Sequence, residues 1–261
     1  MPTSRVLFDV DGPIAFLTFN RPEARNAMTW EMYEALVEAC DRVDADANVR
    51  VFVLRGAGGK AFVSGTDIGQ FTGFSTRDDV VGYEARLDAV IDRVERVRAA
   101  TIAEIDGVAA GGGCILAIAC DLRVCTPEST LGVPVARTLG NCLSAANYAR
   151  MRDLVGLGRV KDLMFTGRLV DGNEALAIGL VNRVVERPAI EIVVRDLAGA
   201  IAGNAPLTIQ ATKEALRRIR ARERLEPSAI EDLITMCYLS DDFKGAVQAF
   251  LEKKTPVFKG R

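Results

Sequence analysis

The sequence of 261 residues contains no histidine. This absence excludes Ser-His-Asp and Cys-His nucleophile systems, zinc sites with histidine ligands, and acid–base catalysis by imidazole. Any chemistry must therefore use carboxylates, hydroxyls, thiols, amides, lysine, arginine or the backbone.

An excess of charge of one sign is also missing. The chain has 33 lysine and arginine residues against 35 aspartate and glutamate residues, a formal net charge of -2, and the basic residues form no stripe, so we predict no nucleic-acid partner. No apolar run is long enough to span a bilayer. Residues 1–5 lead into strand-like sequence without the apolar region of a secretory signal. We therefore expect a cytoplasmic protein with no membrane partner.

The sequence also lacks the usual cofactor motifs. The six cysteines are scattered and form no C-x-x-C pair, which is typical of reduced thiols in a cytoplasm. No cluster has metal-ligand spacing, so no metal site is predicted. Gly56–Ala61 lacks the last glycine of a dinucleotide motif and the Ser or Thr of a P-loop, which excludes both nucleotide sites.

The chain is 49% hydrophobic, which is enough to form one core. The fold class follows from the order of the predicted strands and helices. Strands and helices alternate through the first two thirds, which predicts an α/β domain. The last third predicts three successive helices, each opened by a proline, at 188–202, 206–222 and 227–251. The expected strands are 6–8, 14–19, 49–54, 101–105, 122–125 and 131–133, and the earlier helices are 29–44, 76–99, 113–119, 145–155 and 159–165.

Two glycine turns are the most informative motifs. In Asp106–Asp121 an apolar strand ends at three glycines and a small-residue helix begins, and Lys60–Ile68 holds a second such turn. Glycine lets a backbone approach a ligand closely, and a helix start leaves amides without internal partners. One N–H from each turn is the minimum for an oxyanion hole that stabilises a thioester enolate.

With Asn20–Ala27, Leu163–Arg168 and Glu174–Val181, these turns resemble the crotonase, or enoyl-CoA hydratase/isomerase, family. The resemblance implies a spiral of ββα units over residues 1–200, which binds CoA and forms the oxyanion hole, and a C-terminal helical oligomerisation region over 201–261. It also implies an acyl-CoA thioester as ligand, no cofactor beyond the CoA moiety of that substrate, and a homotrimer or a hexamer.

The resemblance assigns the two oxyanion-hole amides to Thr66 and Gly112. It implies that Thr255–Lys259 reaches a neighbouring subunit's CoA, and that Asp67 has a structural role. The substrate-binding positions that it implies are Arg25, Ala27, Lys60, Ser64, Gly65, Asp67, Ile68, Gly111, Ile115, Val135, Phe258 and Lys259.

The sequence departs from the family at the two catalytic glutamates of its hydratases. Ile115 and Val135 stand at those positions. Adding water to an enoyl double bond needs a base to activate the water and an acid to protonate the α-carbon, and neither side chain can do either. This departure argues against ordinary hydratase activity.

Replacement groups remain open. Asn141, Thr138 and Ser144 could position a water and Arg137 could bind a carboxylate, although such residues more often serve turns and caps. Related enzymes draw acid–base groups from the helix that carries Glu84 and Asp88, whereas the helical pattern favours a solvated face for both. Cys114 and Cys142 are interpreted as small core residues, since a thiolate without a nearby histidine or lysine has little activation.

Three functions therefore stay open. The first is a lyase or isomerase that acts through an enolate, with its acid–base groups at other positions. The second is a CoA-thioester decarboxylase or hydrolase, which could need fewer such groups. The third is a non-catalytic acyl-CoA-binding or scaffold protein.

Overall fold

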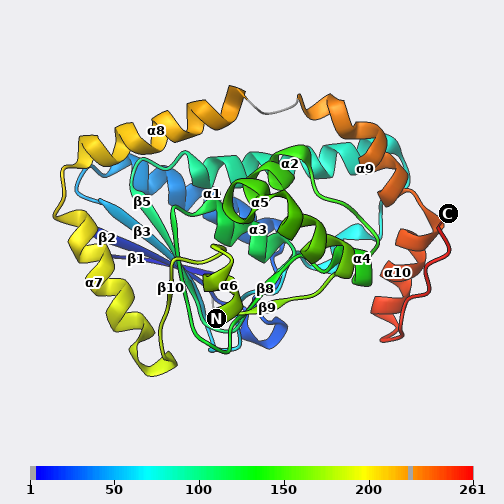
Figure 1. The fold of residues 1–261 in the computed structure, drawn as a ribbon, viewed down its shortest axis with the longest axis horizontal. Helices are drawn as coiled ribbons and strands as arrows, with labels where there is room; N and C mark the ends of the chain where they lie inside the picture. The colour runs from blue at the N-terminus through cyan, green and yellow to red at the C-terminus, as the bar shows by residue number, and fades with distance from the viewer. Residues whose placement is uncertain (1–3, 223–225, 261) are drawn as a thin grey trace.

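The computed structural model of the chain describes residues 4–222 and 226–260. Residues 1–3, part of the N-terminal segment in which we predict no secretory signal, lie outside the described residues. Within the described residues the strands form two sheets, a six-stranded one in the order β1-β2-β3-β5-β7-β10 and a four-stranded one in the order β4-β6-β8-β9 (Figure 1).

The larger sheet begins with the predicted hairpin. Strands β1 (Val6–Asp11) and β2 (Ile14–Phe19) pair antiparallel around Gly12, whose φ of 57° suits a tight turn. The remaining strands continue in parallel, as expected for segments separated by helices. They are β3 (Val51–Gly56), β5 (Ala100–Ile105), β7 (Leu122–Cys125) and β10 (Arg183–Val184).

The smaller sheet was largely missed by the sequence patterns, because its strands have only two or three residues. Strands β4 (Ala61–Val63), β6 (Val108–Ala110) and β8 (Thr130–Gly132) lie parallel, and β9 (Val170–Asp171) is antiparallel to β8. Each of the first three follows a strand of the larger sheet and precedes a helix. The chain therefore repeats a ββα unit and climbs as a spiral.

Helices cover both faces of the larger sheet. On one face α1 (Trp30–Ala45), α2 (Arg77–Glu95) and α3 (Gly112–Ala119) enclose the main core. On the other, α7 (Ile190–Ala202) packs Ile190 and Val194 into a second apolar cluster. Helix α3 is apolar on all sides and buried beyond Gly112, so it forms the centre of the molecule.

The C-terminal helices differ from the sequence prediction in one respect. Helix α8 (Pro206–Arg222) matches, but the single helix predicted over 227–251 is wrong, because a turn divides it into α9 (Glu231–Tyr238) and α10 (Asp241–Leu251). The Ser240 side chain caps α10 by accepting a hydrogen bond from the Phe243 amide at 2.9 Å. A 3-10 helix (Pro227–Ile230) precedes α9. The boundary predicted at 200/201 falls within α7.

Helices α9 and α10 fold back onto the chain's own α2 and onto the 3-10 helix Ile68–Phe71. In Figure 1 they stand at the opposite end of the molecule from α7. The C-terminal region thus lies beside the turn that carries Thr66, within the same chain.

The other helices connect these parts. They are α4 (Val135–Thr138), α5 (Ala145–Thr166), α6 (Gly172–Ala177) and the 3-10 helices Pro22–Ala24 and Arg187–Ala189. The break predicted inside α5 is present as a kink at Gly156 (φ 78°). No single helix in residues 4–222 and 226–260 has the length and apolar character to cross a membrane; only Arg187–Ala202 together with Pro206–Arg222, bent by 100°, meets that criterion.

Candidate active site

The two glycine turns meet where β4 and β6 end. Because these strands are parallel neighbours, their carboxyl ends lie at one edge of the sheet. A Cβ atom built on Gly112 would lie 3.7 Å from the Thr66 amide nitrogen, 3.2 Å from Thr66 Oγ1 and 3.2 Å from the Tyr33 hydroxyl. The backbones at Thr66 and Gly112 therefore face one another at close range.

Glycine is required at this junction for two separate reasons. Gly111 has a φ of 53° and a ψ of -124°, a conformation that a residue with a side chain rarely adopts. At Gly113 a Cβ atom would overlap the Val63 carbonyl, because α3 packs directly on β4. The triple glycine thus brings the start of α3 against the first turn.

The amides of Thr66 and Gly112 have no acceptor in the part of the chain that the structure describes. Gly112 is the first residue of α3, where an N–H has no partner within the helix. The amides beside them are paired: Asp67 donates to the Met28 carbonyl and Gly111 to the Gly132 carbonyl, both at 2.9 Å. Two adjacent donors are therefore left for a ligand.

Two tyrosine hydroxyls support the Thr66 side chain. The Tyr33 hydroxyl from α1 lies 2.8 Å from Thr66 Oγ1, and the Tyr83 hydroxyl from α2 donates to the same oxygen at 3.3 Å. Burial raises the pKa of Tyr33 to about 12 and raises the pKa of Tyr83 well above its usual value. Both hydroxyls stay neutral near pH 7 and act as hydrogen-bonding groups.

Ile115 and Val135 are both apolar core residues. They are 1% and 8% exposed. Ile115 lies on the first turn of α3, where its amide donates to the Gly111 carbonyl at 3.1 Å. Val135 begins α4, three residues after the Gly132 that accepts the Gly111 hydrogen bond. These two positions therefore supply no carboxylate near the glycine turns.

A carboxylate enters from another element. The solvated-face interpretation of Glu84 is wrong, because this side chain is 4% exposed and accepts a hydrogen bond from the Tyr238 hydroxyl of α9. Burial raises the pKa of Glu84 to about 8, although the bond from Tyr238 opposes that rise. Val80 and Leu87, four residues before it and three after, are buried on the same helix, and that spacing could have indicated an inward Glu84.

Asn141 belongs to the same polar group. Its Nδ2 donates to the Tyr238 hydroxyl at 3.0 Å, and its Oδ1 is buried without a partner in the described residues. The sequence marked Asn141 as a candidate but gave no signal for Tyr238, which lies 154 residues from Glu84.

The remaining acid–base candidates have local roles. Arg137 and Thr138 are exposed on α4, and the Thr138 hydroxyl donates to the Pro134 carbonyl at 2.9 Å. Ser144 caps α5 and donates at 2.8 Å to Asp88, which is half-buried and so departs from the solvated face predicted for it. Burial raises the pKa of Cys114 to about 12, so its thiol stays protonated.

The Cys142 thiol is also held protonated. A hydrogen bond with the Cys237 thiol, together with burial, raises the pKa of Cys142. Neither Cys114 nor Cys142 is therefore an activated nucleophile.

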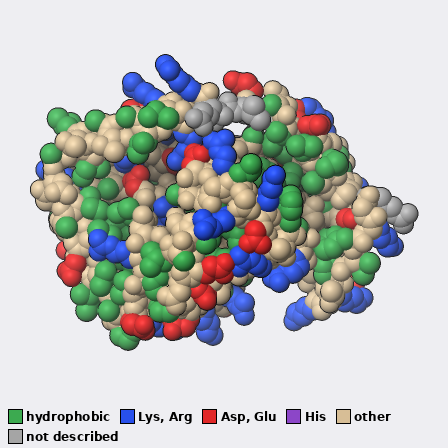
Figure 2. All heavy atoms as spheres, viewed as in Figure 1, with side chains coloured by type: hydrophobic (Ala, Val, Ile, Leu, Met, Phe, Trp, Pro, Cys, Tyr) green, Lys and Arg blue, Asp and Glu red, His purple; other side chains and the backbone are tan. Residues whose placement is uncertain are grey.

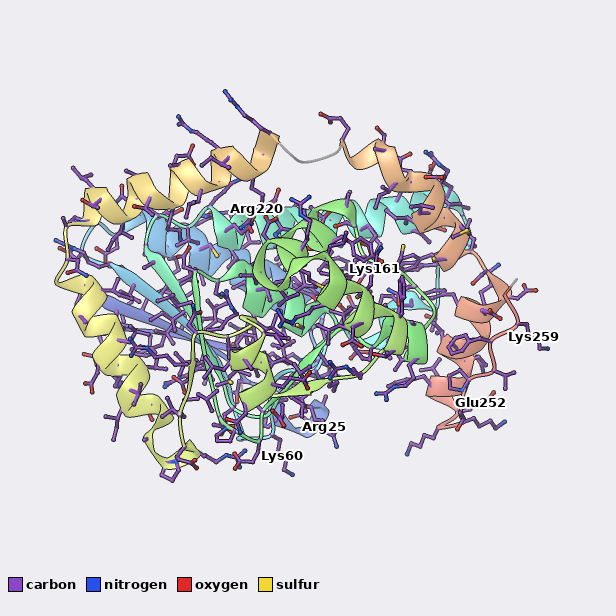
Figure 3. All side chains as sticks on the ribbon, in the orientation of Figure 1. Arg25, Lys60, Lys161, Arg220, Glu252 and Lys259 are labelled. Carbon is purple, nitrogen blue, oxygen red and sulfur yellow. The ribbon has the colours of Figure 1, made fainter. Side chains whose placement is uncertain are left out.

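Most of the implied substrate-binding positions lie on two neighbouring segments. The Asn26 side chain donates to the Ala61 carbonyl at 2.8 Å, and the Ser64 amide donates to the Arg25 carbonyl at 3.1 Å. Ala27, Gly65 and Ile68 belong to the same two segments. Figure 3 shows Arg25 and Lys60 on one rim of the molecule.

Asp67 makes contacts that fit the structural role implied by the resemblance. One of its oxygens accepts from the Gly69 amide at 3.0 Å and the other pairs with Arg21 at 2.6 Å. These contacts fix the turn that carries Thr66.

Phe258 and Lys259 contact their own chain. The Lys259 amide donates to the Asp242 side chain of α10 at 2.7 Å, and the Phe258 ring lies 3.2 Å from where a Cβ of Gly140 would be. Figure 3 shows Lys259 at the end of the molecule formed by α10, away from Arg25 and Lys60.

Comparisons with known proteins agree with this fold. The enoyl-CoA hydratase/isomerase family matches residues 9–261. The chain is 32% identical to the short-chain-enoyl-CoA hydratase of Clostridium acetobutylicum, with 100% of both proteins covered. An enoyl-CoA hydratase from Bacillus anthracis superposes with a TM-score of 0.78 at 29% identity, covering 99% of this chain and 100% of that one.

A methylmalonyl-CoA decarboxylase in complex with 2-nitronate-propionyl-CoA superposes with a TM-score of 0.90 at 26% identity, covering 99% of each chain. The spiral of ββα units with its C-terminal helices is thus a crotonase fold, as predicted. The chain belongs to the enoyl-CoA hydratase/isomerase family.

Proposed function

We propose that this protein is an enzyme that binds an acyl-CoA thioester and stabilises its enolate through the amides of Thr66 and Gly112. The observation that carries the proposal is that two neighbouring amides, those of Thr66 and Gly112, lack acceptors in the described residues. When a proton or a carboxyl group leaves the α-carbon, negative charge develops on the thioester oxygen. Two fixed donors stabilise that charge more strongly than they stabilise the neutral carbonyl, and so lower the barrier.

The surface near the two glycine turns suits the anionic part of CoA. Figure 2 shows this face hollowed between the body and α10, with Lys and Arg side chains along the margins of the hollow. Arg25 and Lys60, on neighbouring segments, are exposed on the lower rim of the body. Cations at such a rim attract the phosphate groups of CoA, while the thioester binds to the amides of Thr66 and Gly112.

The apolar side chains at the family's two glutamate positions favour reactions other than hydration. Ile115 and Val135 offer no group that activates water. An enolate-forming lyase or isomerase that takes its proton-transfer group from another position fits these residues.

A decarboxylase is a second candidate, supported by the likeness to methylmalonyl-CoA decarboxylase. Loss of carbon dioxide leaves its bonding electron pair on the α-carbon, and the thioester oxygen takes up that charge without any base. The enolate then requires only a proton donor. A site that lacks the family's two glutamates is compatible with this reaction, provided that another residue supplies the proton.

We also propose that the protein assembles as a homotrimer or hexamer in the cytoplasm. Helix α8 supports the assembly, because it has no buried residue and exposes Leu207, Leu216 and Ile219. Size-exclusion chromatography with light scattering tests this: a monomer at micromolar concentration contradicts the proposal.

The function is tested by exchange of the α-protons of butyryl-CoA in D2O, followed by mass spectrometry. Enolate formation predicts incorporation of deuterium that depends on the enzyme. Tight binding without exchange, and without carbon dioxide release from malonyl-CoA or methylmalonyl-CoA, would indicate the non-catalytic scaffold instead.

A further inference from the structure

A series of contacts links the turn that carries Gly112 to Glu84 on α2. From Gly112 it passes to Gly111, whose amide bonds the Gly132 carbonyl at 2.9 Å, and β8 then leads into Val135. The Val135 carbonyl accepts from the Gly140 amide at 2.7 Å, which places Asn141 next in the series.

The series closes through two further helices. Asn141 donates to the Tyr238 hydroxyl of α9, and that hydroxyl donates to Glu84 of α2. Tyr83, the neighbour of Glu84, donates to Thr66 Oγ1, and Thr66 faces Gly112. Glu84 also lies within electrostatic reach of Tyr33, whose hydroxyl is 2.8 Å from Thr66 Oγ1, which places Glu84 near the amide pair.

Glu84 differs from the other acidic side chains of α2. It is 4% exposed, whereas Asp88 is half-buried and bonded to Ser144 and Asn147. One oxygen of Glu84 accepts from Tyr238, and the second has no hydrogen-bond partner among the described residues. Burying a carboxyl group without an ion pair is costly, and here it leaves one oxygen able to exchange a proton.

We propose that Glu84 is the acid–base residue that transfers the proton at the α-carbon of the acyl group, held in place by Tyr238 and Asn141. The inference rests on the proposed function. As a base, the Glu84 carboxylate takes the α-proton, the C–H electron pair forms the enolate double bond, and the carbonyl π pair moves onto the thioester oxygen. In the reverse direction neutral Glu84 returns a proton to the α-carbon and becomes the carboxylate again. After loss of carbon dioxide, neutral Glu84 gives its proton to the α-carbon and then takes up a new proton from the solvent.

The ionisation of Glu84 is set by its surroundings. Burial raises its pKa to about 8, the Tyr238 hydrogen bond opposes the rise, and the charge of Asp88 adds to it. Helix α3, packed on the same side of α2, contains no charged residue. The titratable groups that face Glu84 from the elements around it are Tyr33 of α1, Tyr83 and Asp88 of α2, Cys142, Tyr148 of α5 and Tyr238 of α9.

The test compares Glu84→Gln with Glu104→Gln. Glu104 is also a buried glutamate, 8% exposed, but it lies on β5 beside Arg55 and outside the series of contacts. For wild type, exchange of the α-protons of butyryl-CoA in D2O rises with pH to a plateau above about 8. We expect Glu84→Gln to lower the exchange rate by roughly 10²–10⁴-fold and Glu104→Gln to leave it unchanged. Equal exchange by Glu84→Gln and wild type overturns the inference.

A second variant tests the positioning role of Tyr238. Tyr238→Phe removes a hydrogen bond that favours the ionised form of Glu84, so the midpoint of the pH–exchange profile moves to higher pH. A lower rate with an unmoved midpoint contradicts this role.

The ¹³C chemical shift of a labelled thioester carbonyl separates this inference from the proposed function. If wild type polarises the carbonyl but exchanges no protons, Glu84 is not the acid–base residue and the amide pair stands. If wild type does not polarise the carbonyl, the proposed function fails and the inference fails with it. A polarised carbonyl in Glu84→Gln together with lost exchange supports both.

Discussion

Alanine substitutions at two adjacent glycines, Gly112 and Gly113, should have different effects, the first on activity and the second on stability. The added methyl at Gly112 lies 3.2 Å from two hydroxyl oxygens, on Thr66 and Tyr33, which are side chains that can move by a few tenths of an ångström. The destabilisation of Gly112→Ala should therefore be about 1 kcal/mol. The same methyl lies 3.7 Å from the Thr66 amide, whereas an oxygen bonded to that amide needs about 2.9 Å. In the proposed complex, the methyl therefore competes with the thioester oxygen for the space beside the Thr66 amide.

The expected activity loss is that of one missing oxyanion donor, roughly 10²–10³-fold in the rate of α-proton exchange. Gly113→Ala should behave in the opposite way. Its methyl meets the Val63 backbone, which cannot move without shifting β4, so we expect a loss of about 3 kcal/mol or more. Urea unfolding measures the second effect and D2O exchange the first.

The matched control is Gly199→Ala. Gly199 lies in α7 with nothing within 4 Å of an added Cβ, so alanine should stabilise the helix by about 1 kcal/mol and leave exchange unchanged. Wild-type exchange by Gly112→Ala would refute the placement of the thioester oxygen, and wild-type stability of Gly113→Ala would refute the packing of α3 on β4.

Three further changes test other parts of the structure. Asn26→Ala removes a fully buried side chain that bonds the Arg21 amide and the Ala57 and Ala61 carbonyls, so urea unfolding should show a loss of about 3 kcal/mol; a loss below 1 kcal/mol would contradict this role. Ser240→Ala removes the cap of α10 and should cost about 1 kcal/mol in the same measurement, with no change disproving the cap. Burial raises the pKa of Glu104 to about 7; because the folded state then holds its proton more tightly than the unfolded state, the unfolding free energy should fall by about 3 kcal/mol as pH rises from about 4.5 to about 7. Glu104→Gln should remove that fall, and an unaltered pH profile of its stability would count against the assignment.

The long elements could be predicted from the sequence, because their residues are close together in the chain. The hairpin at Gly12, the amphipathic helices α1 and α2, and the change from strand to helix at Gly111 all follow from residues near one another in the chain. The strands of the second sheet could not be predicted in this way, because two or three residues are too few to show an alternation of polar and apolar side chains. Helix α9 ends before Ser240 for a reason that is local but weak, a single capping hydroxyl in an otherwise helical pattern.

The site was predictable only in part for the same reason. The two turns were predicted to approach a ligand because glycine permits close backbone approach, and the family resemblance assigned Thr66 and Gly112 within them; β4 and β6 bring those turns to one edge. The spacing of buried residues on α2 is compatible with an inward Glu84, but its contact with Tyr238 comes from tertiary packing, because α9 lies 154 residues further along the chain. The pattern of residues within a single segment cannot predict a contact between two distant helices.

The most direct test of the paired amides is the ¹³C NMR shift of butyryl-CoA labelled at the thioester carbonyl and bound to the protein. Two hydrogen bonds to the carbonyl oxygen should move the resonance downfield of free butyryl-CoA, and Gly112→Ala should return it towards the free value while the ligand stays bound. A saturated complex whose carbonyl resonates at the free position, in wild type and variant alike, would contradict the account.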